Sequence, residues 1–216
     1  MVRFVVMASG QATRMGQDKL SLPWKNTTVL AYVLNTIRES LELLDPPFFE
    51  VPAEIWVVAR KTSQVYMKGL NEFGEGVFKQ VWINQPTIRP LSDTIRLGLT
   101  DLPQESAGIC FVPADQVGLE PRLLADLIRC FLEKRPDFLI PSTEGCAGVK
   151  GKGKTGSPVF FHRRYIEDLR SLQGEQGGRA VLKQYPERWL TYPVPETFME
   201  DIDTPEDYRR LAALTK

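Results

Sequence analysis

The 216-residue sequence contains a single histidine, His162, and only three cysteines, Cys110, Cys130 and Cys146. One histidine excludes metal sites built from several histidines and argues against a Ser-His-Asp triad. The cysteines are widely spaced, form no CxxC pair and are odd in number, so they argue against a disulfide framework. This usage is typical of a reduced, cytoplasmic setting.

The sequence also lacks an excess of charge and any long hydrophobic run. Lys+Arg and Asp+Glu both number 27, so the formal net charge is zero. This balance gives no support to a nucleic-acid or membrane-surface role, and any positive site must be local. Arg3 interrupts the short apolar stretch at the N-terminus, so we expect neither a signal peptide nor a membrane span.

Short apolar or β-branched runs predict strands, and segments of helical spacing lie between them. The predicted strands are residues 2–7, 54–59, 78–83, 108–114, 137–142, 157–162 and 188–194. Helices are predicted at 28–44, at 121–134 and after Thr204, which is followed by Pro205 and, three residues after the cap, by Asp207. This alternation predicts an α/β fold with a mostly parallel sheet covered on both faces. No repeat or long linker divides the chain, so we expect one domain over residues 1–216.

The loop "ASGQATRMGQDK" (8–19) follows the first predicted strand and is rich in glycine and positive charge. In open α/β sheets, ligands bind beyond the carboxyl ends of the strands. Gly10 and Gly16 allow the backbone to turn its N–H groups toward an anion, and Arg14 and Lys19 supply charge for phosphates. The glycine spacing matches neither a P-loop nor GxGxxG. The simplest alternative is a glycine-rich turn with two solvated basic residues.

The longer stretch "ASGQATRMGQDKLSLPW" resembles the signature loop of the MobA/MocA-type nucleotidyltransferases. The matching positions are Ala8, Gly10, Arg14, Met15, Gly16, Lys19 and Leu20. The resemblance covers essentially the whole chain and implies a three-layer Rossmann-like nucleotidyltransferase fold. It also implies that this loop wraps the triphosphate of a nucleotide, with binding residues Ala8, Ser9, Gly10, Arg14, Gly16 and Lys19.

Two carboxylates are candidate metal ligands. Asp115 ends the hydrophobic strand "GICFVPAD", and Asp203 directly precedes the Thr204 cap. Each is also an ordinary residue for a turn or a helix start. Transfer of a nucleotidyl group needs a hard cation on the phosphates, and Mg²⁺ prefers carboxylate oxygens and water. "PAD" and "DIDTPEDY" resemble the family's metal-binding segments, so Asp115 and Asp203 are predicted to hold Mg²⁺, whereas Asp201 is predicted to be structural.

The segment "GKTGSPVFFHRRYIEDLRSLQGEQGGRAVL" (153–182) resembles the part of the family that faces the acceptor substrate. Ser157 stands where the family usually has Asn or His, and Glu175 replaces the usual Asp. Arg179 is predicted either to pair with Glu175 or to contact an acceptor phosphate. Ser92 is predicted to bind the nucleotide, with helix capping as the alternative. His162 follows an apolar strand and is expected at the edge of the core or on the surface.

The resemblance implies transfer of a nucleoside monophosphate from an NTP to a phosphorylated acceptor, with release of pyrophosphate. Arg14, Lys19 and Asp115 are the predicted catalytic groups, and molybdopterin-type cofactor is the predicted acceptor. Ala8-Ser9-Gly10 and Pro113-Ala114-Asp115 are closer to the cytidylyl than to the guanylyl members, so CTP is favoured over GTP. A molybdoenzyme or an insertion chaperone would be a further partner.

Two other functions compete with this prediction. One is a nucleotidyltransferase for a sugar or polyol phosphate, which a narrower or more polar acceptor pocket would favour. The other is a non-catalytic molybdenum cofactor carrier or insertion chaperone, which the departures at Ser157, Glu175 and Leu91-Ser92 keep open. The joint presence of Arg14, Lys19, Asp115 and Asp203 argues for the enzyme.

Overall fold

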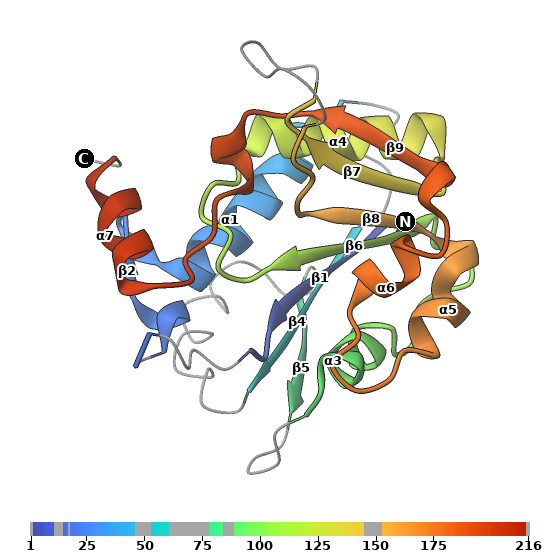
Figure 1. Ribbon diagram of the computed structural model, residues 1–216, viewed down its shortest axis with the longest axis horizontal. Helices are drawn as coiled ribbons and strands as arrows, with labels where there is room; N and C mark the ends of the chain where they lie inside the picture. Colours follow the sequence, from blue (N-terminus) through green and yellow to red (C-terminus); the bar gives the residue numbers. More distant parts are fainter. Residues whose placement is uncertain are drawn as a thin grey trace.

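Seven strands form one central sheet in the order β5-β4-β1-β6-β8-β7-β9 (Figure 1). The structure is a computed structural model, and it describes residues 2–10, 15–16, 18–45, 53–60, 78–83, 89–144 and 153–214. The sheet strands are β1 (Val2–Ala8), β4 (Ala53–Arg60), β5 (Phe78–Ile83), β6 (Gly108–Pro113), β7 (Phe138–Ser142), β8 (Val159–His162) and β9 (Trp189–Pro193). Every predicted strand is present, with ends shifted by at most about two residues.

The mostly parallel character of the sheet is confirmed. β1 pairs in parallel with both β4 and β6, β4 with β5, and β7 with β9. β8 runs antiparallel to its two neighbours, β6 and β7. Outside this sheet, β2 (Pro23–Trp24) and β3 (Thr27–Thr28) form a small antiparallel hairpin that the sequence did not predict.

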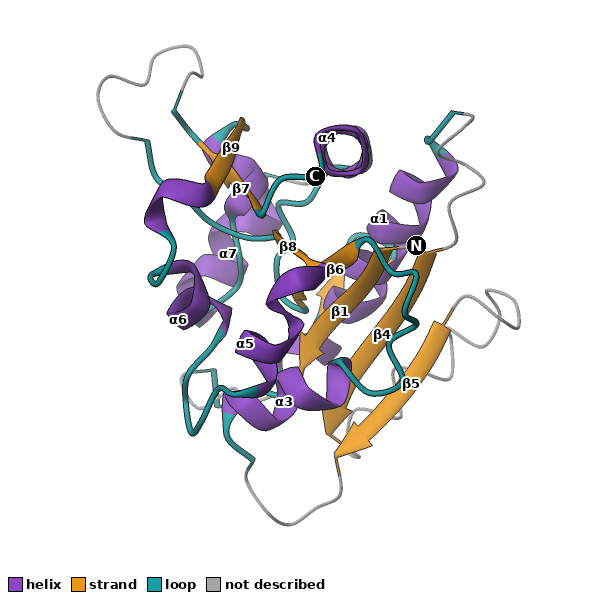
Figure 2. Ribbon diagram, turned by 90° about the vertical axis from the view of Figure 1, so that its right-hand side faces the viewer, coloured by secondary structure: helices purple, strands orange, loops and turns teal. Residues whose placement is uncertain are grey.

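Helices cover both faces of the sheet, which gives the three layers expected for this fold class. α1 (Val29–Glu42) and α4 (Pro121–Lys134) pack on one face, and α3 (Leu91–Gly98), α5 (Ile166–Arg170) and α6 (Gly178–Leu182) pack on the other (Figure 2). β1 shows why both faces are apolar, because Phe4 and Val6 enter one core and Val5 enters the other. Within the described ranges, no helix has the length and apolar character needed to cross a membrane.

The last helix, α7 (Pro205–Ala213), begins as the sequence predicts. The Thr204 amide donates to the Asp207 carboxylate over 2.9 Å, and the Asp207 amide donates to Thr204 Oγ1 over 3.1 Å. This reciprocal capping box satisfies the exposed N–H groups of the first turn. Pro121 likewise occupies the first turn of α4. The short 3₁₀ turns are η1 (Lys19–Ser21), η5 (Arg163–Tyr165), η6 (Pro186–Arg188) and η7 (Glu196–Met199).

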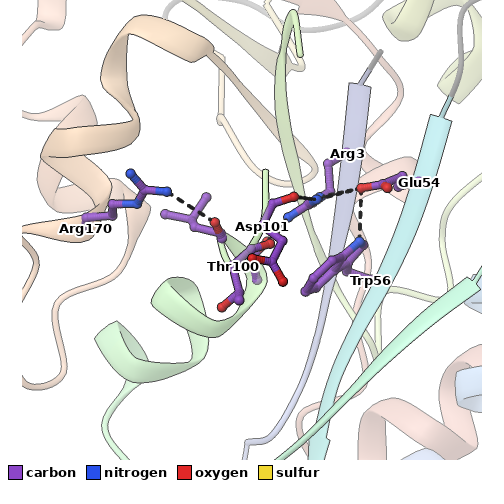
Figure 3. A network of polar contacts seen from close by, with 8 residues as sticks. Arg3, Glu54, Trp56, Thr100, Asp101 and Arg170 are labelled. Carbon is purple, nitrogen blue, oxygen red and sulfur yellow. Dashed lines mark hydrogen bonds and ion pairs between the residues drawn. The ribbon is translucent and has the colours of Figure 1, made fainter. Parts of the chain in front are cut away.

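A buried arginine holds the amino end of β1 to the end of α3 (Figure 3). Arg3 donates from Nε to Glu54 over 2.8 Å, from Nη1 to the carbonyls of Gly98 and Thr100 over 3.2 and 2.6 Å, and from Nη2 to the Asp101 carbonyl over 2.9 Å. Its side chain is fully buried although it carries a charge. The network therefore joins the sheet to α3 at the edge opposite to the carboxyl end of β1.

Candidate active site

The predicted site residues gather at one edge of the sheet. β1 and β6 are parallel, so the segments after them, Ala8–Gly10 and Asp115, leave at the same edge. β8 is antiparallel to β6, so Ser157 approaches its strand from that edge. Strand polarity thus brings together residues that are more than 100 positions apart in the sequence. This edge is where α/β proteins bind ligands.

The loop of residues 8–19, here called the opening loop, is described at residues 8–10, 15–16 and 18–19. Gly16 adopts a φ of +67°, a left-handed conformation that favours glycine. The Ser9 hydroxyl shares a 2.7 Å hydrogen bond with the buried Thr94 hydroxyl of α3, which fixes the start of the loop against that helix. Gly10 is exposed. Arg14 lies outside the described residues, so its contact with phosphates stays a prediction.

Lys19, Asp115 and Asp203 form one polar cluster at this edge. The ammonium of Lys19 forms ion pairs with both carboxylates, with its Nζ 3.4 Å from Asp203 Oδ1. It also donates to the Ile202 carbonyl over 2.8 Å. Burial lowers the pKa of Lys19, but Asp115 and Asp203 outweigh this effect, and the net pKa is raised. Lys19 is therefore a cation held between the two predicted metal ligands.

Backbone contacts explain how Asp203 reaches Asp115 across the sequence. The Ile202 amide donates to the Asp115 carbonyl over 3.1 Å, and the Gly118 amide donates to the Glu200 carbonyl over 3.0 Å. A Cβ at position 118 would lie 1.9 Å from the Thr197 carbonyl oxygen, so only glycine permits this approach. The segment before α7 is thus docked on the loop after β6.

Asp201 adds a third carboxyl to the neighbourhood. The residue is exposed, but the surrounding protein removes part of the water around its carboxyl, and Asp115 and Asp203 repel its negative charge. Together these effects raise its pKa to about 6. No local pattern predicts this shift in pKa, because it depends on the docking of residues 200–203 beside Asp115.

The donor set fits a magnesium-type ion better than a closed metal centre. Asp115, Asp203 and the Ile202 carbonyl all lie around one point, which the Lys19 ammonium contacts. In the part of the chain that the structure describes, no group of three or more His, Cys, Asp or Glu side chains is arranged to hold a metal. Mg²⁺ usually takes one or two carboxylates and completes its shell with water and substrate phosphates, so two carboxylates suffice.

Gln116 is a site residue that the sequence analysis missed. Its buried side-chain amide donates to the Ser157 carbonyl over 2.7 Å and to the Phe198 carbonyl over 3.0 Å. It therefore ties the segment before β8 and the turn η7 to the end of β6. Its Oε1 is buried and has no hydrogen-bond partner among the described residues. A Gln after a strand-end Asp carries no sequence signal for these two distant contacts.

A cavity of about 320 Å³ opens at the same edge on the face covered by α3 and α6. Most of its lining is apolar, including Leu91, Ile95, Phe111, Ile140, Val159 and Trp189. Ser157 and Arg179 contribute polar groups. The exposed Arg179 makes no ion pair with Glu175 among the described residues, so the alternative, contact with an acceptor phosphate, stays the prediction for Arg179. Glu175 is exposed and does not line the cavity.

Two other residues have structural contacts. Ser92 does not cap α3, because Pro90 is the N-cap residue. The Ser92 hydroxyl is buried in the first turn and accepts a hydrogen bond from Arg96 Nη2 over 3.3 Å, so its contact with a nucleotide stays a prediction. His162 pairs with Gly108 at the other edge of the sheet, and its Nδ1 accepts from the Arg164 amide. It therefore lies at the opposite end of the strands from Asp115.

The fold, together with the polar cluster and the cavity at the carboxyl ends of the strands, defines an α/β protein of the nucleotidyltransferase class. The sequence matches the model of the MobA-like NTP transferase domain over residues 4–189, and the chain belongs to this family. It is also 24% identical over 211 residues to the purine catabolism protein PucB of Bacillus subtilis, covering 94% of this chain and 92% of PucB.

Solved structures share the fold at low sequence identity. Rv0371c of Mycobacterium tuberculosis matches with a TM-score of 0.76 and 20% identity over 98% of both chains, and a second structure of it is a complex with manganese. The 4-diphosphocytidyl-2C-methyl-D-erythritol synthase of Anaerococcus prevotii matches with a TM-score of 0.71 and 17% identity, over 99% of this chain and 95% of that one.

Proposed function

We propose that the protein transfers a nucleoside monophosphate from an NTP, with CTP favoured over GTP, to the phosphate of a molybdopterin-type cofactor and releases pyrophosphate. The observation that carries this proposal is the largely apolar cavity at the carboxyl ends of β1 and β6, with Arg179, which has no ion-pair partner among the described residues, in its lining. An apolar cavity accepts a flat heteroaromatic ring, and a guanidinium binds a phosphate group. The cavity of about 320 Å³ lies within the usual range for small-molecule sites.

In this proposal the protein's own groups bind and orient two phosphate-bearing molecules. The opening loop and Lys19 hold the triphosphate, together with Arg14, which lies outside the described residues. An oxygen of the acceptor phosphate forms a new bond to the α-phosphorus, while the bond to the bridging oxygen of the β-phosphate breaks and pyrophosphate leaves. The attacking oxygen is already ionised, so the protein need not supply a general base.

Asp115 and Asp203 would hold a divalent metal ion, for which we propose Mg²⁺. The ion would neutralise charge on the α-phosphate and the leaving pyrophosphate. The manganese complex of Rv0371c supports the use of a divalent cation by this fold. The proposed setting is the cytoplasm, where a molybdoenzyme or an insertion chaperone would receive the product.

A polyol phosphate is the second candidate acceptor, because the solved neighbour from Anaerococcus prevotii is named as a methylerythritol-type synthase. The apolar lining of the cavity argues against it, since the hydroxyl groups of a polyol need hydrogen-bond partners when they leave water. A carrier that binds cofactor without turnover is the third candidate.

The test is pyrophosphate release by the purified protein with Mg²⁺ and molybdenum-loaded molybdopterin, with CTP, GTP, ATP and UTP measured in parallel. We expect release with CTP. Release with GTP alone would change the assigned nucleotide, and release only with a polyol phosphate as acceptor would change the assigned acceptor. No release with any acceptor, beside an active control enzyme, combined with tight cofactor binding would favour the carrier.

A further inference from the structure

The Lys19 ammonium lies between the two candidate metal ligands and forms an ion pair with each. It forms an ion pair with Asp115, lies 3.4 Å from Asp203 Oδ1 and donates to the Ile202 carbonyl over 2.8 Å. The side chains of Lys19 and Asp115 are only 19% and 15% exposed. Little water therefore screens the Lys19–Asp115 pair, whereas Asp203 is 54% exposed and is the carboxylate that solvent reaches.

A divalent cation and the Lys19 ammonium cannot both contact these carboxylates without strong repulsion. The repulsion between like charges at contact distance is several-fold larger at a partly buried site than in bulk water. For a metal ion to bind Asp115 and Asp203, the ammonium must move away. A triphosphate offers it a new set of negative oxygens, which the proposed function places beside the same loop.

The local structure allows the side chain to move while its backbone stays in place. Lys19 begins the short turn η1, and the preceding Asp18 accepts a hydrogen bond from the Leu20 amide over 3.1 Å. Leu20 is buried in the main core. The backbone of the turn is thus anchored on both sides of Lys19, while the lysine side chain has a flexible four-carbon stem.

We propose that Lys19 is an internal counter-ion of the metal site: it holds Asp115 and Asp203 in the nucleotide-free protein and moves to the triphosphate when metal and nucleotide bind. This inference rests on the metal ligands assigned under the proposed function. Metal and nucleotide binding then depend on each other. The triphosphate draws the Lys19 ammonium away from the two carboxylates, and the metal displaces the ammonium toward the triphosphate. Such coupling is reciprocal by linkage.

The inference is tested by Mn²⁺ binding without nucleotide, with free Mn²⁺ measured by electron paramagnetic resonance. We expect Lys19→Met to bind Mn²⁺ about tenfold more tightly than the unaltered protein, because the competing cation is gone. Lys19→Arg, which keeps the charge, should stay within about twofold. Lys154→Met is the matched control: it removes an exposed lysine that pairs with Glu196 rather than with the two metal ligands.

Equal or weaker Mn²⁺ binding by Lys19→Met, or the same tightening in Lys154→Met, overturns the inference. Adding Asp115→Asn to Lys19→Met should remove the gained affinity, and if it does not, both the metal assignment and the inference fail. Circular dichroism confirms that each variant is folded. If the expected Mn²⁺ pattern is found in a protein that releases no pyrophosphate, this inference stands and the proposed reaction falls.

Discussion

Two cations, Arg3 and Lys19, lie toward opposite ends of β1 and differ in burial and in their binding partners. Arg3, at the amino end, is fully buried and is bound by Glu54, by three carbonyl groups and by the ring of Trp56, 3.9 Å from its guanidinium (Figure 3). Lys19, beyond the carboxyl end, is 19% exposed and is bound by two carboxylates and one carbonyl.

The two residue types suit these two places. The planar guanidinium of Arg3 uses several fixed donors at once, which is appropriate for a permanent link between strand and helix. The lysine ammonium is a point charge on a flexible stem, and it faces more negative charge than it can neutralise, with Asp201 nearby as a third carboxyl. The comparison indicates that the contacts at the amino end of β1 stabilise the fold. Under the proposed function, the contacts of Lys19 beyond the carboxyl end are exchanged for contacts with ligands.

The end of the sheet that carries Lys19 and Asp115 is called the site end below. The largest effect expected there is a loss of turnover without a loss of stability. Asp115→Ala should reduce pyrophosphate release at least about 10³-fold, because a ligand of the proposed ion is removed. The free energy of unfolding in urea should change by less than about 1 kcal/mol, because Lys19 keeps its contacts with Asp203 and the Ile202 carbonyl, and the loss of Asp115 relieves its repulsion of Asp201. Asp126→Ala on α4 is the control and should keep full turnover. Unchanged pyrophosphate release by Asp115→Ala would remove Asp115 from the metal site.

The opposite result is expected at the other end of β1. Arg3→Met should destabilise the protein by about 3 kcal/mol or more, because Glu54 and three carbonyls lose a buried charged partner. Turnover per folded molecule should stay close to normal. Arg209→Met breaks an exposed pair with Glu206 and should cost less than about 0.5 kcal/mol. Urea unfolding measures both variants, and equal losses would contradict the distinction between the two ends.

A third variant tests whether the Gln116 hydrogen bonds stabilise the site end and position the acceptor segment. Gln116→Leu removes two donors from the buried carbonyls of Ser157 and Phe198, so we expect a loss of about 1–2 kcal/mol. Ser157 lines the acceptor cavity, so the KM for the acceptor should rise more than the KM for the nucleotide. Steady-state kinetics and urea unfolding test this prediction. Equal rises in both KM values would show that Gln116 does not specifically position the acceptor segment.

The sequence predicts the sheet well because each strand carries its own local signal. The run "GICFVP" carries no charged or polar side chain and "VRFVVM" has only Arg3, as expected for strands covered on both faces, and both form β-strands. The start of α7 was equally local, since Thr204 and Asp207 cap it within four residues. By contrast, α5 and α6 have only five residues each, too few for a periodic pattern.

The site was predictable only in part. Strand order placed Asp115 and the opening loop at the same edge, which sequence reasoning can anticipate. The contact between Lys19 and Asp203 joins residues 184 positions apart and depends on the docking of Gly118 against residues 197–200. The two hydrogen bonds from Gln116 depend on the same docking. Such contacts come from tertiary packing, which no local pattern encodes.

The smallest effect we predict concerns the pH dependence of stability at the site end. Asp201 has a pKa of about 6 in the folded protein, above the value of about 3.9 expected for an unfolded chain. The folded state therefore binds this proton more tightly. The associated stability is fully present below about pH 4 and is lost as the pH rises through about 6.

Asp201→Asn should remove this dependence. In buffer with a metal chelator, the Tm of Asp201→Asn should match that of the unaltered protein at pH 4, apart from a constant offset. At pH 7.5 it should lie about 1–2 °C higher relative to that offset, a small gain because the residue is exposed. A difference in Tm that is the same at both pH values would mean that neither partial desolvation nor repulsion by Asp115 and Asp203 raises the pKa of Asp201. The site end would then lack the excess negative charge that distinguishes it from the surroundings of Arg3.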